Sequence, residues 1–454
     1  MNIYCDVINM FREESPVTVM LRGTLENVFA AEELDQLFRN YARRQHEDEL
    51  LFSSVVDLMG LAVAKVRPSV HAAYQHRKEQ MTVTIKSIYD KLSGIEAAVS
   101  RGLVRDTAAR LAKLNVAMKA PLPPLLPGYR TKILDGNHLR HTDRRLKALR
   151  TLNAAPLPGH ALVVLDPSLM LVIDAFPCED GHAQERSLLP QVLRTVEAGD
   201  LWIEDRNFCT VGFLCGIAQK NAAFLVRLHA KMPFLSAGER KRRGRCSTGV
   251  VYEEPVIVTD AEKREHRFRH LVIYLDKPTR DGETEIHLVT NLPKRIVARK
   301  LADLYRNRWT IEAAFGEIAA AFHGEINTLA YPPAALFGFC LALTMYNVLS
   351  VTKAAIRVAH AVGNETISMY HLAEEIACTY RGMMIALPPA YWEEEFGSLT
   401  VPQMASKLIA LAKKVKLAHF RKHPRGPKRP PPKRFNKKHR RHVSTKRVLE
   451  QCKT

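Results

Sequence analysis

Two aspartates stand where the chain could bring their carboxylates together. Asp135 ends the short apolar run TKILD, and Asp205 ends a second short run, DLWIED. Carboxylates that converge within a few ångströms repel one another, and such pairs persist mainly where a cation offsets their charge. If the fold places the two strand ends side by side, this pair predicts a site for a divalent metal ion.

The segments around these aspartates predict the order β-β-β-α-β. TKILD, HALVVLD (160–166) and LMLVIDAF (169–176) are three strand-like runs, followed by the helical GHAQERSLLPQVLRTVEAG and by the fourth run, DLWIED. That order is the core of the ribonuclease H-like fold, an α/β sheet in which the first and fourth strands are neighbours. Asp135 and Asp205 would then project from adjacent strand ends.

Other aspartates near these runs favour structural functions. We expect Asp166 and Asp174 to cap turns, and Asp180 to cap the helix that runs to Val196.

A third acid lies in the segment LYRNRWTIEAAFGEIAAAF (304–322), whose apolar spacing predicts a helix. Tyr305, Arg308 and Glu312 share one face of that helix. Taken alone, Arg308 and Glu312 would be an ordinary surface ion pair worth a few tenths of a kcal/mol, roughly. For Trp309, packing against the sheet is favoured over stacking on a nucleic-acid base.

The composition points to a polyanionic partner. The chain has 454 residues, a formal net charge of +20 and 46% hydrophobic residues, so it can bury a core, and nucleic acid is favoured over an anionic membrane surface. Its eight cysteines show no zinc-like spacing, which is typical of reduced cytosolic thiols. The N-terminus lacks a signal-peptide pattern. The apolar run 334–351 contains Thr344, Tyr346 and Asn347, which favours a buried core helix over a membrane span.

Changes in composition divide the chain into five parts. Residues 1–125 are predicted to be a helical, DNA-binding domain, in which 82–104 could be a helix-turn-helix or an ordinary helix pair. The α/β core is predicted for 126–221 and 294–355, interrupted by a β-rich insertion at 222–293. A helical region follows at 356–420. Residues 421–454 form a basic tail that we expect to be disordered.

Two basic clusters are candidates for phosphate contact. The run ERKRRGRC (239–246), with Arg242 and Arg243, is expected to form a loop that either contacts phosphate or is merely solvated. In residues 421–447, thirteen residues are Lys or Arg and none is acidic. Sequence-independent DNA contact is favoured there over a solvated tail.

Several motifs in order resemble the DDE transposases of the insertion sequence four family. They are ILDGNHL, DGHAQE, WIEDRNF and TNLP…LADLYRNRWTIEAAFGEI. The family signature in the last of these is Tyr, two residues, Arg, three residues, Glu, six residues, Lys, and Tyr305, Arg308 and Glu312 occupy its first three positions. Two positions depart from the family: Ala319 stands where the Lys would be, and Asn207 where Gly is usual.

The resemblance implies a catalytic and metal-binding triad of Asp135, Asp205 and Glu312. It implies two Mg²⁺ ions, replaceable by Mn²⁺, that serve DNA cleavage and strand transfer. Its partners would be double-stranded DNA, both inverted-repeat ends and target, with a homodimer in the synaptic complex, in the cytoplasm at the nucleoid and with no membrane partner. The expected DNA-binding residues are Tyr305, Arg308, Arg242, Arg243, Lys433, Arg434, Lys437, Lys438, Arg440 and Arg441.

Two other classes of protein remain open. A ribonuclease H-like nuclease would share the metal site but would not need the N-terminal helical region. A catalytically silent or domesticated DNA-binding protein would bind the same ends without metal-dependent cleavage.

Deletion of residues 421–447 tests the function expected of the tail. Binding of specific and random DNA should weaken about equally, and the salt dependence should flatten, because each lost phosphate contact lowers the log–log slope by about 0.9. Binding measured over a salt series checks this, and an unchanged slope would mean that the tail does not contact DNA.

Overall fold

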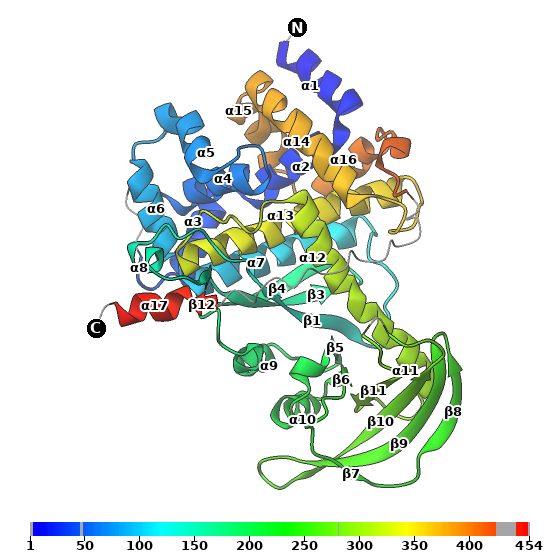
Figure 1. Ribbon diagram of the computed structural model, residues 1–454. Helices are drawn as coiled ribbons and strands as arrows, with labels where there is room; N and C mark the ends of the chain where they lie inside the picture. The colour runs from blue at the N-terminus through cyan, green and yellow to red at the C-terminus, as the bar shows by residue number, and fades with distance from the viewer. Residues whose placement is uncertain (1–2, 46–48, 280, 424–441, 453–454) are drawn as a thin grey trace.

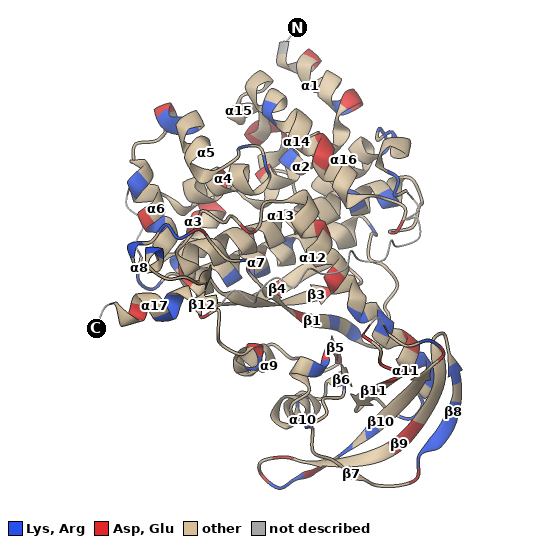
Figure 2. Ribbon diagram, viewed as in Figure 1, with Lys and Arg blue, Asp and Glu red and all other residues tan. Residues whose placement is uncertain are grey.

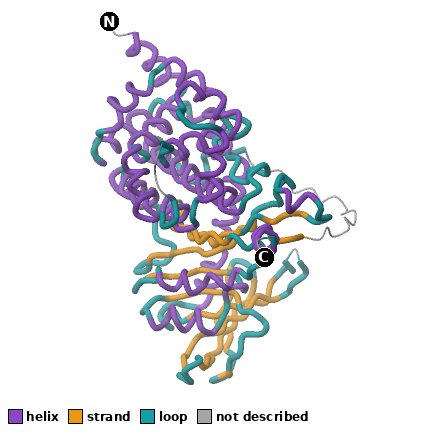
Figure 3. The backbone as a smooth tube through the Cα atoms, turned by 90° about the vertical axis from the view of Figure 1, so that its left-hand side faces the viewer, coloured by secondary structure: helices purple, strands orange, loops and turns teal. Residues whose placement is uncertain are grey.

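The computed structural model describes residues 3–45, 49–279, 281–423 and 442–452 (Figure 1). It is a mixed α/β structure in which most helices gather on one side of a large sheet (Figure 3). The strands of this sheet are β1 (Arg130–His138), β3 (His160–Asp166), β4 (Leu171–Cys178), β5 (Asp200–Glu204), β6 (Ala223–Arg227), β7 (Leu235–Ser236), β8 (Lys241–Cys246), β9 (Gly249–Thr259), β10 (Glu265–Leu275) and β11 (Glu285–Thr290).

The sheet has ten strands in the order β4-β3-β1-β5-β6-β11-β10-β9-β7, and β8 also pairs with β9. β1 is antiparallel to β3 and parallel to β5, and β5 is parallel to β6. The four runs predicted as strands before residue 206 are strands of this sheet, in the predicted order. The first and fourth of them, β1 and β5, are neighbours.

Side chains alternate between two cores because consecutive strand residues point to opposite faces. Ile133 of β1 and Ile203 of β5 face the large helical layer. Leu134 and Trp202 face a smaller core under α9 (Leu189–Arg194) and α10 (Val211–Gln219), which cover the other face. The sheet is therefore buried on both faces at β1 and β5, which explains their apolar sequences.

The region 222–293 is rich in strands, as predicted, but these strands extend the core sheet. β6 pairs with β5 on one side and with β11 on the other, so the ladder runs from β5 into the extension without a break. The long strands β9 and β10 curve away from the helical layer (Figure 1). The expected loop at 239–246 was wrong, since residues 241–246 are the edge strand β8.

Helices from both ends of the sequence form one layer. Its members are α1 (Ile3–Glu14), α2 (Pro16–Val28), α3 (Ala31–Tyr41), α4 (Phe52–Val63), α5 (Val70–Arg77), α6 (Ile85–Gly94), α7 (Ala97–Ala117), α13 (Pro332–Ala359), α14 (Met369–Ala386), α15 (Pro389–Trp392) and α16 (Val401–Ala412). α2 packs against α14 and α16, and α7 packs between α13 and β4. The regions 1–125 and 356–420 thus share one hydrophobic core instead of forming separate units.

The possible helix-turn-helix is the pair α6–α7. Val99, Leu103 and Leu111 of α7 are fully buried, and the helix packs on β4 and α13. Because this helix is part of the core, it is not free to enter a DNA groove, and the ordinary helix pair is the alternative that fits.

The apolar run 334–351 lies in α13, which is long and apolar enough to cross a membrane by length and composition, yet its most apolar stretch is entirely buried. The predicted core helix is therefore confirmed. The polar residue Asn347 of α13 has a structural function. Its side chain accepts from the N–H of Val172 on β4 at 2.8 Å and donates to the carbonyl of Val172 at 2.7 Å. These bonds satisfy the backbone N–H and C=O of Val172 on β4, the outermost strand of the sheet.

The C-terminal region is partly folded. β12 (His442–Ser444) pairs in parallel with β2 (Ala155–Leu157), and α17 (Thr445–Gln451) follows it near α8 (Lys147–Arg150). Arg447 of α17 bonds Asp180 at 2.7 Å. The expectation of disorder over 421–454 was therefore wrong for 442–452. The predicted contacts lie outside the described residues; they are Lys433, Arg434, Lys437, Lys438, Arg440 and Arg441.

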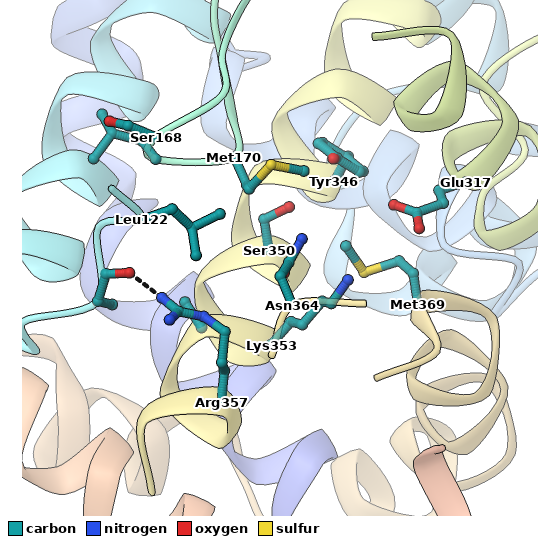
Figure 4. A pocket seen from close by; sticks show the side chains of 13 residues that line it. Leu122, Ser168, Met170, Glu317, Tyr346, Ser350, Lys353, Arg357, Asn364 and Met369 are labelled. Atoms are coloured by element: carbon teal, nitrogen blue, oxygen red, sulfur yellow. Dashed lines mark hydrogen bonds between the residues drawn. The ribbon is translucent and has the colours of Figure 1, made fainter. Parts of the chain in front are cut away.

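A small polar cavity of about 10 Å³, enough for about one water molecule, lies beside α13 (Figure 4). Tyr346, Ser350 and Lys353 line it from α13, and Glu317 faces it from the neighbouring helix. Lys353 is only 4% exposed, and burial lowers the pKa of its ammonium group to about 8. Burying this charge costs stability.

Replacing Lys353 with methionine should therefore stabilise the protein. At pH 7 the lysine is charged in both states, so Lys353→Met should raise the free energy of unfolding, by at most about 3 kcal/mol. The gain should shrink as the pH rises from about 8 toward the unfolded-state value near 10.4, where the wild-type lysine no longer carries a buried charge.

Urea unfolding at pH 7 and pH 10 measures the difference. Lys300→Met, at an exposed lysine, is the control. A Lys353→Met gain that stayed constant over this pH range would contradict the explanation by charge burial.

Candidate active site

Asp135 lies within β1, and Asp205 directly follows the last residue of the neighbouring strand β5. The parallel ladder ends with the pair Leu134 and Glu204, so each aspartate is the next residue along its chain after the last pair. They continue the alternation of Ile133 and Ile203, which face the large helical layer. The predicted neighbouring positions on the first and fourth strands are those of the structure, but Asp135 does not end its strand, since β1 continues to His138.

The segment predicted as one helix at 304–322 is divided. α11 (Ala298–Tyr305) leads into a 3-10 turn, η4 (Arg306–Arg308), before α12 (Trp309–Ala321). The side chain of Asn307 donates to the carbonyl of Leu304 at 3.0 Å, a local bond that competes with regular helical pairing. α12 packs against β1 and brings Glu312 to the aspartates.

Arg308 joins two of the three acids. Its guanidinium donates to Asp135 Oδ2 at 3.1 Å and to Glu312 Oε1 at 2.6 Å. Arg308 is 8% exposed, so these charge-assisted bonds are shielded from water and exceed an ordinary surface pair in strength. The pairing of Arg308 with Glu312 is thus part of a partly buried cluster, in which the Glu312 side chain is 37% exposed.

The carboxylates share one electrostatic environment. Burial raises the pKa of Asp135 to about 6, while Arg308 and the N–H of Gly136 oppose that rise. The charges of Glu312 and Asp205 add to it, as expected for like charges in proximity. The negative charges of both other acids therefore act on Asp135.

The cluster has the chemistry of a divalent-metal site. Three carboxylates offer hard oxygen ligands of the kind that Mg²⁺ prefers, and the Arg308 guanidinium stands between two of them as a counter-charge. Across the described ranges, no group of three His, Cys, Asp or Glu side chains is close enough together to hold an ion. The donor types fit a metal, and the carboxylates would have to draw closer around it.

Two aromatic residues differ from expectation. Trp309 is 62% exposed, so the favoured packing against the sheet was wrong; its ring centre lies 5.3 Å from the guanidinium carbon of Arg308. Tyr305 is only 8% exposed, and burial raises the pKa of its hydroxyl. A direct contact of Tyr305 with the DNA backbone does not fit that burial, whereas support of the neighbouring Arg308 does.

The remaining predicted site residues lie elsewhere. Arg242 and Arg243 are on the edge strand β8, which packs against α11 and is strongly basic (Figure 2). Arg243 bonds Glu253 at 2.9 Å, while Arg242 is exposed. Ala319 is exposed on α12, so a lysine there would not have to be buried.

Of the three aspartates expected to have structural functions, only Asp166 caps a turn as predicted; the turn cap expected of Asp174 was wrong, because Asp174 lies within β4. Asp166 accepts the N–H groups of the turn that follows it. Asp174 pairs with Arg101 of α7 at 2.8 Å. Asp180 does not cap the helix, which begins later; it accepts the N–H of His182 and binds Arg447. A tertiary partner from the far end of the chain could not be read from the local sequence.

Removal of Arg308 tests its function as counter-charge. Arg308→Gln should lower the free energy of unfolding by about 3 kcal/mol, because the partly buried carboxylates lose their cation. Millimolar Mg²⁺ should restore more stability to the variant than to the wild type. Thermal unfolding with and without Mg²⁺ measures both effects, with the exposed neighbour Arg306→Gln as control. Equal stability of Arg308→Gln and wild type would contradict this function.

Comparisons with known proteins agree with the geometry. Residues 129–348 match the family model described as Transposase DDE domain. The chain is 31% identical over 127 residues to "Putative transposase y4zB" of Sinorhizobium fredii, a match that covers 28% of this chain and only 35% of that protein.

A cryo-EM structure of a piggyBac transposase synaptic complex with hairpin DNA is similar at a TM-score of 0.40 and 9% identity, over 88% of this chain and 86% of that one. This TM-score is too low to establish a common fold, so the assignment depends on the family match. The chain therefore carries a transposase DDE domain over residues 129–348, which include Asp135, Asp205 and Glu312, and by that domain it belongs with the DDE transposases.

Proposed function

We propose that the protein is a transposase of the insertion sequence four kind, which binds the inverted-repeat ends of its element and cleaves and joins DNA strands. The observation that carries the proposal is the bonding of Asp135 and Glu312 to one guanidinium, with Asp205 at the adjacent strand end. The match to the transposase DDE domain supports it.

Asp135, Asp205 and Glu312 would hold two Mg²⁺ ions, for which Mn²⁺ can substitute. Such a pair of ions, when bound, activates an attacking water or 3′-hydroxyl and stabilises the leaving oxygen of the phosphodiester. Asp135 would hold the ions together with Asp205 and Glu312, whose charges both raise its pKa.

Arg308 orients the two acids that it bonds, and its charge opposes the rise in the pKa of Asp135. Tyr305 is buried three residues before Arg308, and its hydroxyl interacts electrostatically with the guanidinium. Trp309 presents an exposed ring beside the site, suited to stacking on an unpaired base near the cut strand, because every base offers a π-face to an aromatic side chain.

The basic edge strand β8 is proposed as a DNA-backbone contact. Lys241 and Arg242 are exposed there, and Arg245 is 57% exposed although it pairs with Asp276. Since β8 packs against α11, DNA that follows this edge passes close to the helix that leads to Arg308. The tail residues predicted above would add phosphate contacts without reading the sequence.

The proposed partners are the inverted-repeat ends and the target DNA, within a homodimeric synaptic complex at the nucleoid. A catalytically silent DNA-binding protein is the second candidate, favoured by one observation: Ala319 stands in place of the lysine that the family signature carries.

Neutral substitutions of the triad test the chemistry. Asp135→Asn, Asp205→Asn and Glu312→Gln keep the side-chain shape but remove a metal-ligand charge, so each should abolish cleavage and joining while end binding is retained. The assay incubates purified protein and Mg²⁺ with DNA that carries the flanking ends of its own gene.

Glu317→Gln, on the same helix, is the matched control and should cleave normally. Cleavage at the wild-type rate by a triad variant would remove that residue from the site. A wild-type protein that binds the ends but never cuts them would favour the silent binder.

A further inference from the structure

The dipeptide Glu185–Arg186 holds the turn that follows Asp205. It begins the short 3-10 helix η2 (Glu185–Leu188), which contacts the turn η3 (Arg206–Phe208). Asn207 donates its side-chain N–H to Glu185 Oε2, and Arg186 Nε donates to the carbonyl oxygen of Asn207 at 2.6 Å. Residue 207 is thus bound through both its side chain and its backbone.

The same glutamate lies against the residue that follows Asp135. A Cβ atom added to Gly136 would lie only 2.0 Å from Glu185 Oε1, so glycine is what allows the carboxylate to approach β1. Glu185 Oε1 is also 3.4 Å from Nδ1 of His138, two residues farther along the strand. Its side chain is 14% exposed, so these contacts are well protected from water.

The backbone ladder cannot set the spacing of the two aspartates by itself. Pairing between β1 and β5 ends at Leu134 and Glu204, one residue before each acid. Beyond that point Asp135 is still paired with Val163 of β3, whereas the chain after Asp205 leaves the sheet for η3. The position of Asp205 relative to Asp135 therefore depends on what holds η3 against β1.

We propose that Glu185, with Arg186, is a positioning element that sets the distance between Asp135 and Asp205 from the opposite face of the sheet. This inference rests on the proposed function, because the distance matters only if the two acids share metal ions. Groups that orient metal ligands without touching the metal typically contribute 10- to 100-fold to metal affinity. Glu185 is not itself assigned as a ligand.

Mn²⁺ binding to the full-length protein without DNA, measured by isothermal titration calorimetry, tests this inference. Glu185→Ala should weaken Mn²⁺ binding about 10- to 100-fold. Glu185→Gln should bind nearly as the wild type, because an amide oxygen can still accept from Asn207. If Glu185 were a metal ligand, Glu185→Gln would be as damaged as Glu185→Ala, and the positioning function would be wrong.

Gly136→Ala provides a second, independent test of the same contact, since its added methyl group should displace the Glu185 carboxylate. Alone it should weaken Mn²⁺ binding, but in the Glu185→Ala background it should add little, as expected for two changes that act on one contact. Losses that multiply independently would contradict the proposal. Glu262→Ala, at an acid on a distant turn that is 65% exposed, removes the same charge and should bind as the wild type.

The outcomes separate the two proposals. If the wild type binds Mn²⁺ and cleaves its DNA ends while Glu185→Ala and Gly136→Ala keep wild-type affinity, the positioning function is wrong and the proposed function stands. If the wild type neither binds Mn²⁺ nor cleaves, the proposed function itself fails. Should Glu185→Ala not fold, Gly136→Ala alone decides, because its backbone position is otherwise an ordinary strand residue.

Discussion

The repulsion among three carboxylates at one end of the sheet is the constraint on which the rest of the site depends. Asp135 and Asp205 come from parallel neighbouring strands, and Glu312 comes from a helix that is distant in sequence. Like charges in so protected a place are unfavourable without compensation. Arg308 supplies that compensation through its bonds to Asp135 and Glu312. The guanidinium thus provides positive charge at a cluster whose carboxylates are suited to binding a metal cation.

The surroundings of the cluster serve the same constraint. The turn η4 places Arg308 between Asp135 of β1 and Glu312 of α12, and the buried Tyr305 precedes it by three residues. Below the sheet, Glu185 and Arg186 hold the turn after Asp205. Contacts on both faces of the sheet therefore hold the acids, because the pairing between β1 and β5 ends one residue before each aspartate.

Much of this core was predictable because it follows local rules. Strands buried on both faces must be apolar, so the runs that end in Asp135 and Asp205 were readable from sequence. The family signature located Glu312. The break at η4 was not readable, because it depends on the side-chain bond of Asn307. Nor were the exposure of Trp309 or the contacts of Glu185, since both depend on which segments meet in space. Glu185 belongs to the motif DGHAQE, which singled it out in the sequence, but nothing in the local sequence indicated that it would bond Asn207.

The helical layer has a consequence for synthesis of the chain. α7 packs on α13, and α2 packs on α14 and α16. The N-terminal helices can therefore bury their apolar faces only after about 300 further residues have been synthesised. At a translation rate of about 5–20 residues per second, that wait lasts roughly 15–60 s. During that interval the nascent chain exposes surfaces that only its own late segments can cover. A ribosome that stops early therefore releases a product whose N-terminal half cannot complete its core.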